Sequence, residues 1–336
     1  MKPLVLLTTS AFATGLLFSV RSRLELDECF ETVVVMSDDP AFDELLPRAF
    51  AVIGQPDLPT ARIQRARQLE AICNVEGNFV ANVDYEACFE QRIRVLSCAP
   101  VYAQPVAEYA LGLALDLARG ITAADRDFRA GRERYSQDGT GGSVLLRHAD
   151  VGLVGMGNLG RALLPLLRPF SPRLRVYDPW MPIRALADLD VQPVELDELL
   201  AASSFVFVLA ASTTENTHLL DARRLALMPA GARLVLVSRA AAVDFDALYE
   251  QVASGRLTAA VDVWPEEPLP LDDRGRRLDG LVLSAHRAGG VPSAFPQIGE
   301  MVVDDLRQLA AGLPPVRMQA AVPELVGRYR NKPVER

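Results

Sequence analysis

Short apolar runs alternate with stretches of helical spacing over the first hundred residues of the chain. The runs are rich in valine, isoleucine and leucine, as buried strands are. Such alternation of strand-like and helix-like segments predicts a parallel sheet covered by helices. The expected strands span residues 4–8, 32–36, 50–53, 69–73 and 94–98.

A second and longer series of the same kind begins at residue 151. Its runs are almost continuously apolar, which is typical of parallel strands buried on both faces. Before it, Pro100 and Pro105 are expected to interrupt the chain, ahead of a long apolar helix over residues 106–121 that would pack between domains or subunits. The expected strands span residues 151–154, 174–177, 205–209, 233–237, 257–262 and 281–286.

Together the two series predict an α/β protein of two Rossmann-like or flavodoxin-like domains, each with a parallel sheet, and a cleft between them. Residues 293–312 have helical spacing and are expected to cross back to the first domain. The first domain would then be discontinuous, comprising residues 1–103 and 293–336, and the second would comprise residues 104–292.

A glycine motif opens the second series and points to a dinucleotide. Gly155, Gly157 and Gly160 follow an apolar strand, and Asp178 ends the next strand. Three glycines at this spacing allow a tight turn, close approach of backbone to a pyrophosphate and close packing of a helix on the sheet, while an acid about 20 residues on can bind the adenosine ribose. The acid would repel the additional phosphate of NADP. The second domain is therefore expected to bind NAD.

The composition of the chain limits the classes of protein to which it can belong. The chain has 336 residues, of which 50% are hydrophobic and 23% charged, and a formal net charge of −8. This balance is typical of a soluble globular protein and argues against a nucleic-acid partner. Thr8, Thr9 and Ser10 interrupt the apolar segment 4–20, so a buried strand is favoured over a leader peptide or membrane span, and a cytoplasmic protein is expected.

The cysteines give no sign of a metal centre. None of the four forms a CxxC pair or a Cys/His ligand spacing, so they are expected to be buried free thiols and no metal is expected. They are Cys29, Cys73, Cys88 and Cys98.

Candidate chemistry gathers at the ends of three expected strands. Of the three histidines, His148 and His218 are expected to be structural, whereas His286 ends the last strand. Arg239 and Glu267 follow two other strands. Because ligands of parallel sheets bind at the carboxyl ends of strands, these side chains are expected to meet. The histidine would exchange a proton, the carboxylate would orient it, and the guanidinium would bind a substrate carboxylate.

At these motifs the chain resembles the D-isomer-specific 2-hydroxyacid dehydrogenases over nearly its whole length. The resemblance implies catalytic roles for Arg239, Glu267 and His286, and a homodimer to which the apolar helix contributes. The matching segments are 83–84, 86–87, 106–110, 151–160, 225–231, 238–239, 243–244, 262–268 and 285–290.

The resemblance also implies a set of binding residues. A substrate loop at 76–80 would grip the substrate carboxylate through its backbone, and Asp262 would lie near the nicotinamide carboxamide. The implied cofactor-binding residues are Gly155, Gly157, Asn158, Leu159, Gly160, Asp178, Ala211, Val237, Asp262 and Gly289. The implied substrate-binding residues are Gly77, Asn78, Phe79 and Arg239.

Several positions depart from the family pattern and concern the substrate. Phe79 replaces the second glycine of the loop, and Glu76 lies where phosphoglycerate dehydrogenases carry a basic residue. The expected substrate is therefore a non-phosphorylated 2-keto or D-2-hydroxy acid, with an apolar or aromatic group near Phe79. The alternative is an NAD(H)-sensing regulator of the corepressor type on the same fold. The other departures are Ala81, Ala210, Leu236 and Ala240.

Overall fold

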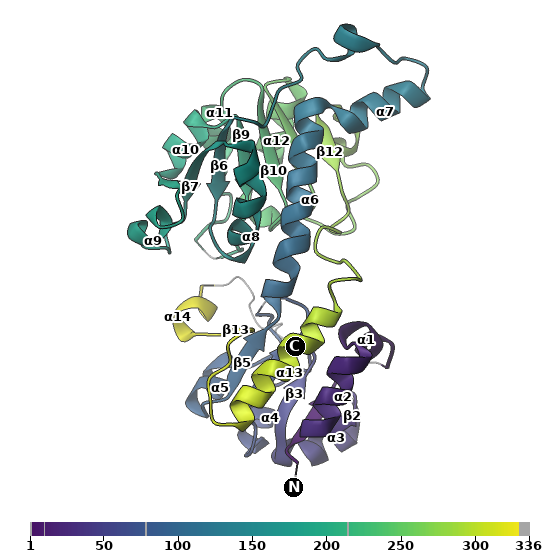
Figure 1. The fold of residues 1–336 in the computed structure, drawn as a ribbon, viewed down its shortest axis with the longest axis vertical. Helices are drawn as coiled ribbons and strands as arrows, with labels where there is room; N and C mark the ends of the chain where they lie inside the picture. The colour runs from purple at the N-terminus through teal and green to yellow at the C-terminus, as the bar shows by residue number, and fades with distance from the viewer. Residues whose placement is uncertain (1, 10, 78, 214, 329–336) are drawn as a thin grey trace. The chain divides into compact units, whose positions relative to one another are not determined.

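The computed structural model describes residues 2–9, 11–77, 79–213 and 215–328. These residues form two compact units, Met1–Ala103 with Gly290–Arg336 and Gln104–Gly289. Each unit contains one sheet with helices on both faces (Figure 1). The predicted α/β class with two mainly parallel sheets is therefore confirmed.

The sheet of the smaller unit has the order β13-β5-β4-β3-β1-β2, in which β13 alone is antiparallel. Without β13 this is the flavodoxin-like order 2-1-3-4-5. The strands are β1 Leu4–Leu7, β2 Glu31–Val34, β3 Ala49–Ile53, β4 Ala71–Asn74, β5 Arg94–Ser97 and β13 Gln319–Ala320. The α-helices are α1 Ala11–Leu17, α2 Val20–Cys29, α3 Pro40–Leu45, α4 Thr60–Arg65, α5 Tyr85–Glu90, α13 Pro296–Ala310 and α14 Pro323–Val326.

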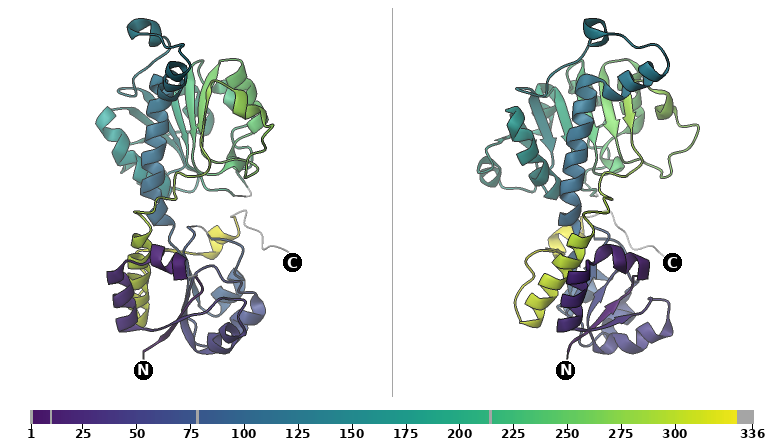
Figure 2. Two further views of the ribbon diagram at one scale, coloured as in Figure 1. Left: turned by 90° about the vertical axis from the view of Figure 1, so that its right-hand side faces the viewer. Right: turned by 45° about the vertical axis from the view of Figure 1, so that its right-hand side comes forward.

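Alternate residues of these strands enter two different cores. Val5 and Leu7 of β1 pack with α2 and α13, whereas Leu4 and Leu6 pack with α3 and α4. The period of two follows from the pleat of the strand, and burial on both faces explains the continuous apolar run. Helix α13, from the end of the chain, lies beside α2, as the views in Figures 1 and 2 agree. Helix α13 thus belongs to the same unit as the first residues of the chain.

The sheet of the larger unit has the order β12-β11-β10-β9-β6-β7-β8 and is parallel throughout. Numbered from β6, the order is that of the Rossmann fold with one further strand. The strands are β6 Asp150–Val154, β7 Arg173–Tyr177, β8 Gln192–Pro193, β9 Phe205–Val208, β10 Ala232–Leu236, β11 Leu257–Val261 and β12 Leu281–Leu283. The α-helices are α6 Ala99–Arg119, which begins in the smaller unit, α7 Ile121–Arg129, α8 Asn158–Leu167, α9 Ile183–Ala187, α10 Leu196–Ala202, α11 Ala222–Leu227 and α12 Phe245–Ala253.

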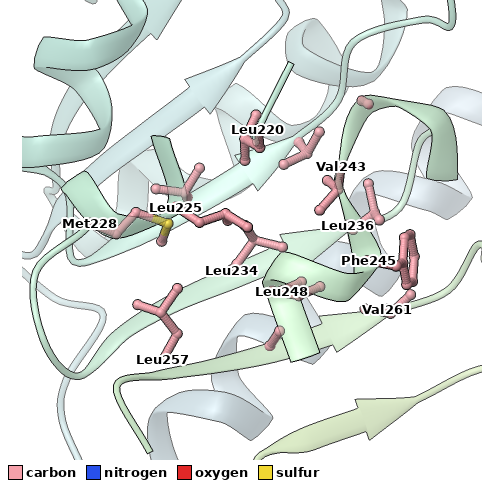
Figure 3. Packing of buried hydrophobic residues seen from close by; sticks show 14 of the residues in the cluster. Leu220, Leu225, Met228, Leu234, Leu236, Val243, Phe245, Leu248, Leu257 and Val261 are labelled. Carbon is pink, nitrogen blue, oxygen red and sulfur yellow. The ribbon is translucent and has the colours of Figure 1, made fainter. Parts of the chain in front are cut away.

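The two faces of this sheet again carry separate cores. Phe205 and Phe207 of β9 pack with α6 and α8, whereas Val206 and Val208 pack with α10, α11 and α12. Figure 3 shows the second core, in which Leu248 of α12 lies among the aliphatic side chains of the strands. Burial of so many apolar side chains holds the strands in place. Residues that directly follow the strands therefore have defined positions at the edge of the sheet.

The expectation that the two prolines interrupt the chain is wrong. Helix α6 runs through both, because Pro100 lies in the first turn, where its missing N–H has no intrahelical acceptor. Pro105 removes one internal hydrogen bond, but Val106, Ala107 and Ala110 follow it directly into the core of the larger unit. Packing therefore outweighs the local cost.

Among the described residues, no helix is long and apolar enough to cross a membrane. All four cysteines are free thiols, and three are buried, as predicted, whereas Cys29 is only partly buried. Burial raises the pKa of Cys88 and of Cys98 to about 12, so neither thiol is a nucleophile at neutral pH.

Candidate active site and cofactor site

The glycine turn after β6 has the shape that a dinucleotide requires. Gly155 has φ of +102°, and a Cβ there would lie 2.8 Å from the backbone nitrogen of Ala210. A Cβ on Gly160 would lie 2.6 Å from the carbonyl oxygen of Gly155, so α8 packs directly on the turn. A Cβ on Gly157 would meet nothing within 4 Å. The middle glycine thus leaves open the space through which a pyrophosphate reaches the backbone.

Asp178 lies beside this turn at the end of β7. Its Oδ2 accepts a hydrogen bond of 2.8 Å from the backbone N–H of Met156, and Oδ1 accepts one of 3.0 Å from the N–H of Trp180. The side chain is only partly buried, and each carboxylate oxygen has a second lone pair. The carboxylate is therefore fixed against the turn while it can still accept from ribose hydroxyls.

Helix α8 completes the phosphate site. Gly157 is its N-cap and Asn158 its first residue, followed by Leu159. A helix N-terminus presents unpaired backbone N–H groups to an anion. The open glycine, the close helix and the fixed acid together fit NAD.

The remaining predicted cofactor residues lie at neighbouring strand ends. Ala211 is exposed in the segment after β9, and Val237 is buried directly after β10. Gly289 is the last residue of the larger unit. Asp262, buried directly after β11, is the fourth of these positions, and the binding of a cofactor by all four stays a prediction.

The predicted catalytic residues follow three adjacent strands. Arg239 comes after β10, Glu267 after β11 and His286 after β12, and these strands pair in that order. The carboxyl ends of parallel neighbours lie at one edge of the sheet, which is why three residues far apart in sequence approach each other.

Glu267 and His286 are in direct contact. Glu267 Oε2 lies 2.6 Å from His286 Nδ1, and the side chains remain 36% and 48% exposed, so an external molecule can reach them. Burial would raise the pKa of Glu267, but hydrogen bonds from His286 and from the backbone N–H of Trp264 outweigh it and hold the pKa below its usual value. The glutamate is therefore ionised at neutral pH and fixes one ring nitrogen of the histidine.

Arg239 lies close enough to Glu267 for their charges to interact. Burial lowers the pKa of Arg239, and the negative charge of Glu267 opposes that shift. Its Nη1 donates a hydrogen bond of 2.7 Å to the carbonyl oxygen of Ser238. The structure thus brings all three predicted groups to one edge, with a side-chain hydrogen bond between Glu267 and His286.

Trp264, to which the sequence pattern assigned no role, holds two of these segments. Its backbone N–H donates 2.9 Å to Glu267 Oε1, and its indole Nε1 donates 2.7 Å to the carbonyl oxygen of Ser284. A tryptophan two residues after Asp262, at the end of a strand, is the only signal that the sequence offers.

The predicted substrate loop belongs to the smaller unit. Gly77 has φ of +96°, and its carbonyl oxygen accepts from Ser97 Oγ at 2.5 Å. Phe79 is only 4% exposed and its ring makes an edge contact with Tyr85, with the centroids 6.3 Å apart. Asn78 lies outside the described residues.

Among the described residues, no side-chain hydrogen bond joins the other two histidines to Arg239, Glu267 or His286. His148 Nδ1 lies 3.3 Å from the carbonyl oxygen of Ser171, and the backbone N–H of His218 donates to Ala241. In the part of the chain that the structure describes, no group of acidic, histidine or cysteine side chains is arranged to hold a metal ion.

Comparisons with known proteins agree with this geometry. Residues 111–288 match the family model of the D-isomer specific 2-hydroxyacid dehydrogenase, NAD binding domain. The chain is similar to a hydroxypyruvate reductase of Thermotoga maritima, with 30% identity over 298 residues that cover 88% of this chain and 93% of that protein. It is also similar in structure to a phosphoglycerate oxidoreductase from Rhizobium etli, with TM-score 0.86, 41% identity, and coverage of 96% of this chain and 99% of that one.

A D-3-phosphoglycerate dehydrogenase of Archaeoglobus fulgidus is 30% identical over 279 residues, which cover 82% of this chain. The match covers 52% of that protein, so the chain spans about half of its length. These relatives are named as reductases, oxidoreductases or dehydrogenases, and the alternative of a corepressor-type regulator finds no support in them. The chain belongs to the family of D-isomer specific 2-hydroxyacid dehydrogenases, and residues 111–288 are its NAD-binding domain.

Proposed function

We propose that this protein interconverts a non-phosphorylated 2-keto acid and the corresponding D-2-hydroxy acid with NAD(H), and that His286 donates and accepts the proton. The observation that carries the proposal is the 2.6 Å contact between Glu267 Oε2 and His286 Nδ1. A carboxylate on Nδ1 orients the ring and leaves Nε2 to exchange a proton with a substrate oxygen.

The other groups have roles that follow from their chemistry. Bound NAD(H) would supply or accept the hydride. Arg239 carries a planar guanidinium that matches a carboxylate in two-point geometry, so it would hold the acid group of the substrate. Gly77 and Phe79 would contribute backbone N–H groups, because glycine has no side chain and the Phe79 ring is packed in the core of the smaller unit.

The substrate loop favours an acid without a phosphate group. Glu76 is exposed beside it, and residues 71–91 contain neither lysine nor arginine. A phosphate dianion would meet repulsion there and no compensating cation from this segment. The names of two of the relatives mention phosphoglycerate, so the phosphorylated acid is the direct competitor in any assay.

We also propose a cytoplasmic homodimer formed through the larger unit. The segment after α6 exposes Ile121, Phe128, Tyr135 and Leu145, each at least 58% accessible. Exposed apolar side chains gathered in one segment are typical of an association surface. Helix α6 itself uses its apolar residues from Val106 onward within its own unit. Sedimentation velocity of the protein tests the dimer, and a monomer at micromolar concentration would contradict it.

The activity is tested by mixing the purified protein with NADH and a panel of keto acids. Glyoxylate, hydroxypyruvate and phenylpyruvate are compared with phosphohydroxypyruvate, and the chirality of each product is determined. We expect loss of NADH absorbance with a non-phosphorylated acid and a D product. Turnover of phosphohydroxypyruvate alone would overturn the substrate class, and tight NADH binding without any turnover would overturn the enzymatic proposal.

A further inference from the structure

A chain of hydroxyl groups lies behind the turn that carries His286. The hydroxyl oxygens of Tyr109, in α6, and Ser284, after β12, are 2.7 Å apart, and Ser284 Oγ lies 2.5 Å from Asp262 Oδ1. An ionised carboxylate only accepts hydrogen bonds, so the single proton of Ser284 points to Asp262. Tyr109 must then donate to Ser284. The result is one directed series from Tyr109 through Ser284 to Asp262.

The carboxylate at the end of this series grips the backbone next to His286. Asp262 Oδ1 also accepts from the N–H of Arg287 and Oδ2 from the N–H of Ala288, each at 3.0 Å. The carbonyl oxygen of Asp262 accepts from the N–H of His286 itself at 2.7 Å. Asp262 is 1% exposed, so these donors replace the water that its charge would otherwise require.

The turn has a conformation that needs such support. His286 has φ of +48°, in the left-handed region that side chains other than glycine and asparagine rarely adopt, and its flanking residues Ala285 and Arg287 are exposed. Apolar packing therefore does little to hold the residues on either side of the histidine. The bonds from Asp262 on both sides of the Cα define the direction in which the ring leaves the backbone.

We propose that Tyr109 and Ser284 are positioning residues for the proton-transfer histidine, acting only through the Asp262 carboxylate. The inference rests on the proposed function and extends it to two side chains outside the Arg239, Glu267 and His286 set. Without the Ser284 hydroxyl, the Asp262 carboxylate loses one of the three hydrogen bonds that it accepts and holds the turn less firmly. The ring then spends less time in contact with Glu267.

A double-variant cycle on kcat tests the series. We expect Ser284→Ala to lower kcat about tenfold, as loss of a supporting hydrogen bond typically does, with the KM for the keto acid changed less than about twofold. Ser284→Thr retains the hydroxyl and should restore kcat. Tyr109→Phe should lower kcat about threefold in the natural background and leave it unchanged in Ser284→Ala, because the two groups act as one series.

Tyr249→Phe is the matched control. It removes a phenolic hydroxyl that donates 3.0 Å to the carboxylate of Asp273, in the same unit but outside the site. Its kcat should equal that of the natural protein. Hydrogen exchange of the peptide containing Arg287 and Ala288 adds a readout that needs no turnover, and we expect faster exchange in Ser284→Ala than in either Ser284→Thr or Tyr249→Phe.

Multiplying effects in the double variant, or unchanged exchange at residues 287–288, would overturn the inference while leaving the proposed function intact. If the natural protein reduces no keto acid, the proposed function fails and the exchange data alone decide the inference.

Discussion

The carboxyl edges of the two sheets differ in how many of their polar side-chain atoms have a hydrogen-bond partner. At the edge of the larger sheet, Asp262, Glu267 and Ser284 accept or donate hydrogen bonds within the unit. At the edge of the smaller sheet, buried carboxamide atoms of three residues make no hydrogen bond among the described residues. They are Gln55 Nε2, Asn74 Nδ2 and Oδ1, and Asn82 Oδ1.

This difference indicates that the two edges meet different functional requirements. Proton transfer needs groups fixed before the substrate arrives, and the hydrogen bonds of Asp262, Glu267 and Ser284 supply that order without cost during the reaction. A buried amide without a partner costs free energy, so a protein retains several of them only where another requirement applies. The edge near the predicted substrate loop therefore leaves several carboxamide atoms without a partner in the described part of the chain, whereas at the edge that carries His286 the buried hydroxyl of Ser238, beside Arg239, is in that state.

The largest expected effect comes from removing the proton-transfer group, His286, at the carboxyl edge of the larger sheet. His286→Asn should lower kcat about a thousandfold, because general acid catalysis contributes that order of rate, while the dissociation constant of NADH changes little. Asparagine tolerates the positive φ of this residue, so the backbone is not strained by the change. Stopped-flow reduction and fluorescence titration of NADH give the two quantities.

His148→Asn is the control for this variant, since His148 has φ of +59° and is exposed outside the site. It should retain the natural kcat. Turnover by His286→Asn within about twofold of the natural rate would remove His286 from the mechanism, because a lost general acid costs far more.

The carboxylate beside the histidine should have the next largest effect. Glu267→Gln keeps the shape but removes the charge, and kcat should fall about 10- to 100-fold, as for other residues that orient a catalytic group. Because the fold lowers the pKa of Glu267, its contribution to stability is present above the ordinary carboxyl pKa and is lost as the pH falls through the lowered value. The Tm difference between the natural protein and Glu267→Gln should therefore shrink on acidification. A difference that does not vary between neutral and acid pH would contradict the ionised carboxylate.

At the glycine turn, the expected effect concerns cofactor choice. Asp178→Asn retains an oxygen for the N–H of Met156 and removes the charge that opposes a ribose phosphate. The ratio of kcat/KM for NADPH to that for NADH should rise about tenfold, which corresponds to the loss of one unfavourable charge contact. Steady-state kinetics with both cofactors measure it. An unchanged ratio would show that the carboxylate is not near the ribose.

The edge that holds the candidate site was predictable from the sequence because strand ends carry a clear signal. Apolar runs located β10 and β11 to within one residue, whereas β12 ends at Leu283 and not at His286 as predicted. The rule that ligands bind at carboxyl ends then grouped Arg239, Glu267 and His286. The glycine spacing likewise located the turn before α8. Both signals are local, and each depends on a few neighbouring residues.

The supporting hydrogen bonds were not predictable in this way. Tyr109 and Ser284 are 175 residues apart, and no periodic pattern relates them. The course of α6 through Pro105 was also missed, because a local rule for proline cannot include the burial of the residues that follow it. Tertiary contacts that override local preference leave no trace in a single sequence.

The smallest expected effect concerns the carboxyl edge of the smaller sheet. Asn74 is fully buried, and its carboxamide makes no hydrogen bond of standard geometry among the described residues, although it lies close enough to the Tyr85 hydroxyl to interact with it. Asn74→Leu replaces the amide by an apolar group of similar shape, so the free energy of unfolding should stay the same or rise by about 1 kcal/mol. Urea unfolding of the protein without substrate measures this difference.

Asn82→Leu is the contrasting variant on the same edge. Asn82 Nδ2 donates 2.9 Å to the carbonyl oxygen of the buried Pro56, which the change would leave without that donor. This variant should lose about 1–3 kcal/mol, the cost of an orphaned buried acceptor. If Asn74→Leu is destabilised as much as Asn82→Leu, the Asn74 amide is bonded in solution, for example by an ordered water, and the contrast between the two edges does not hold.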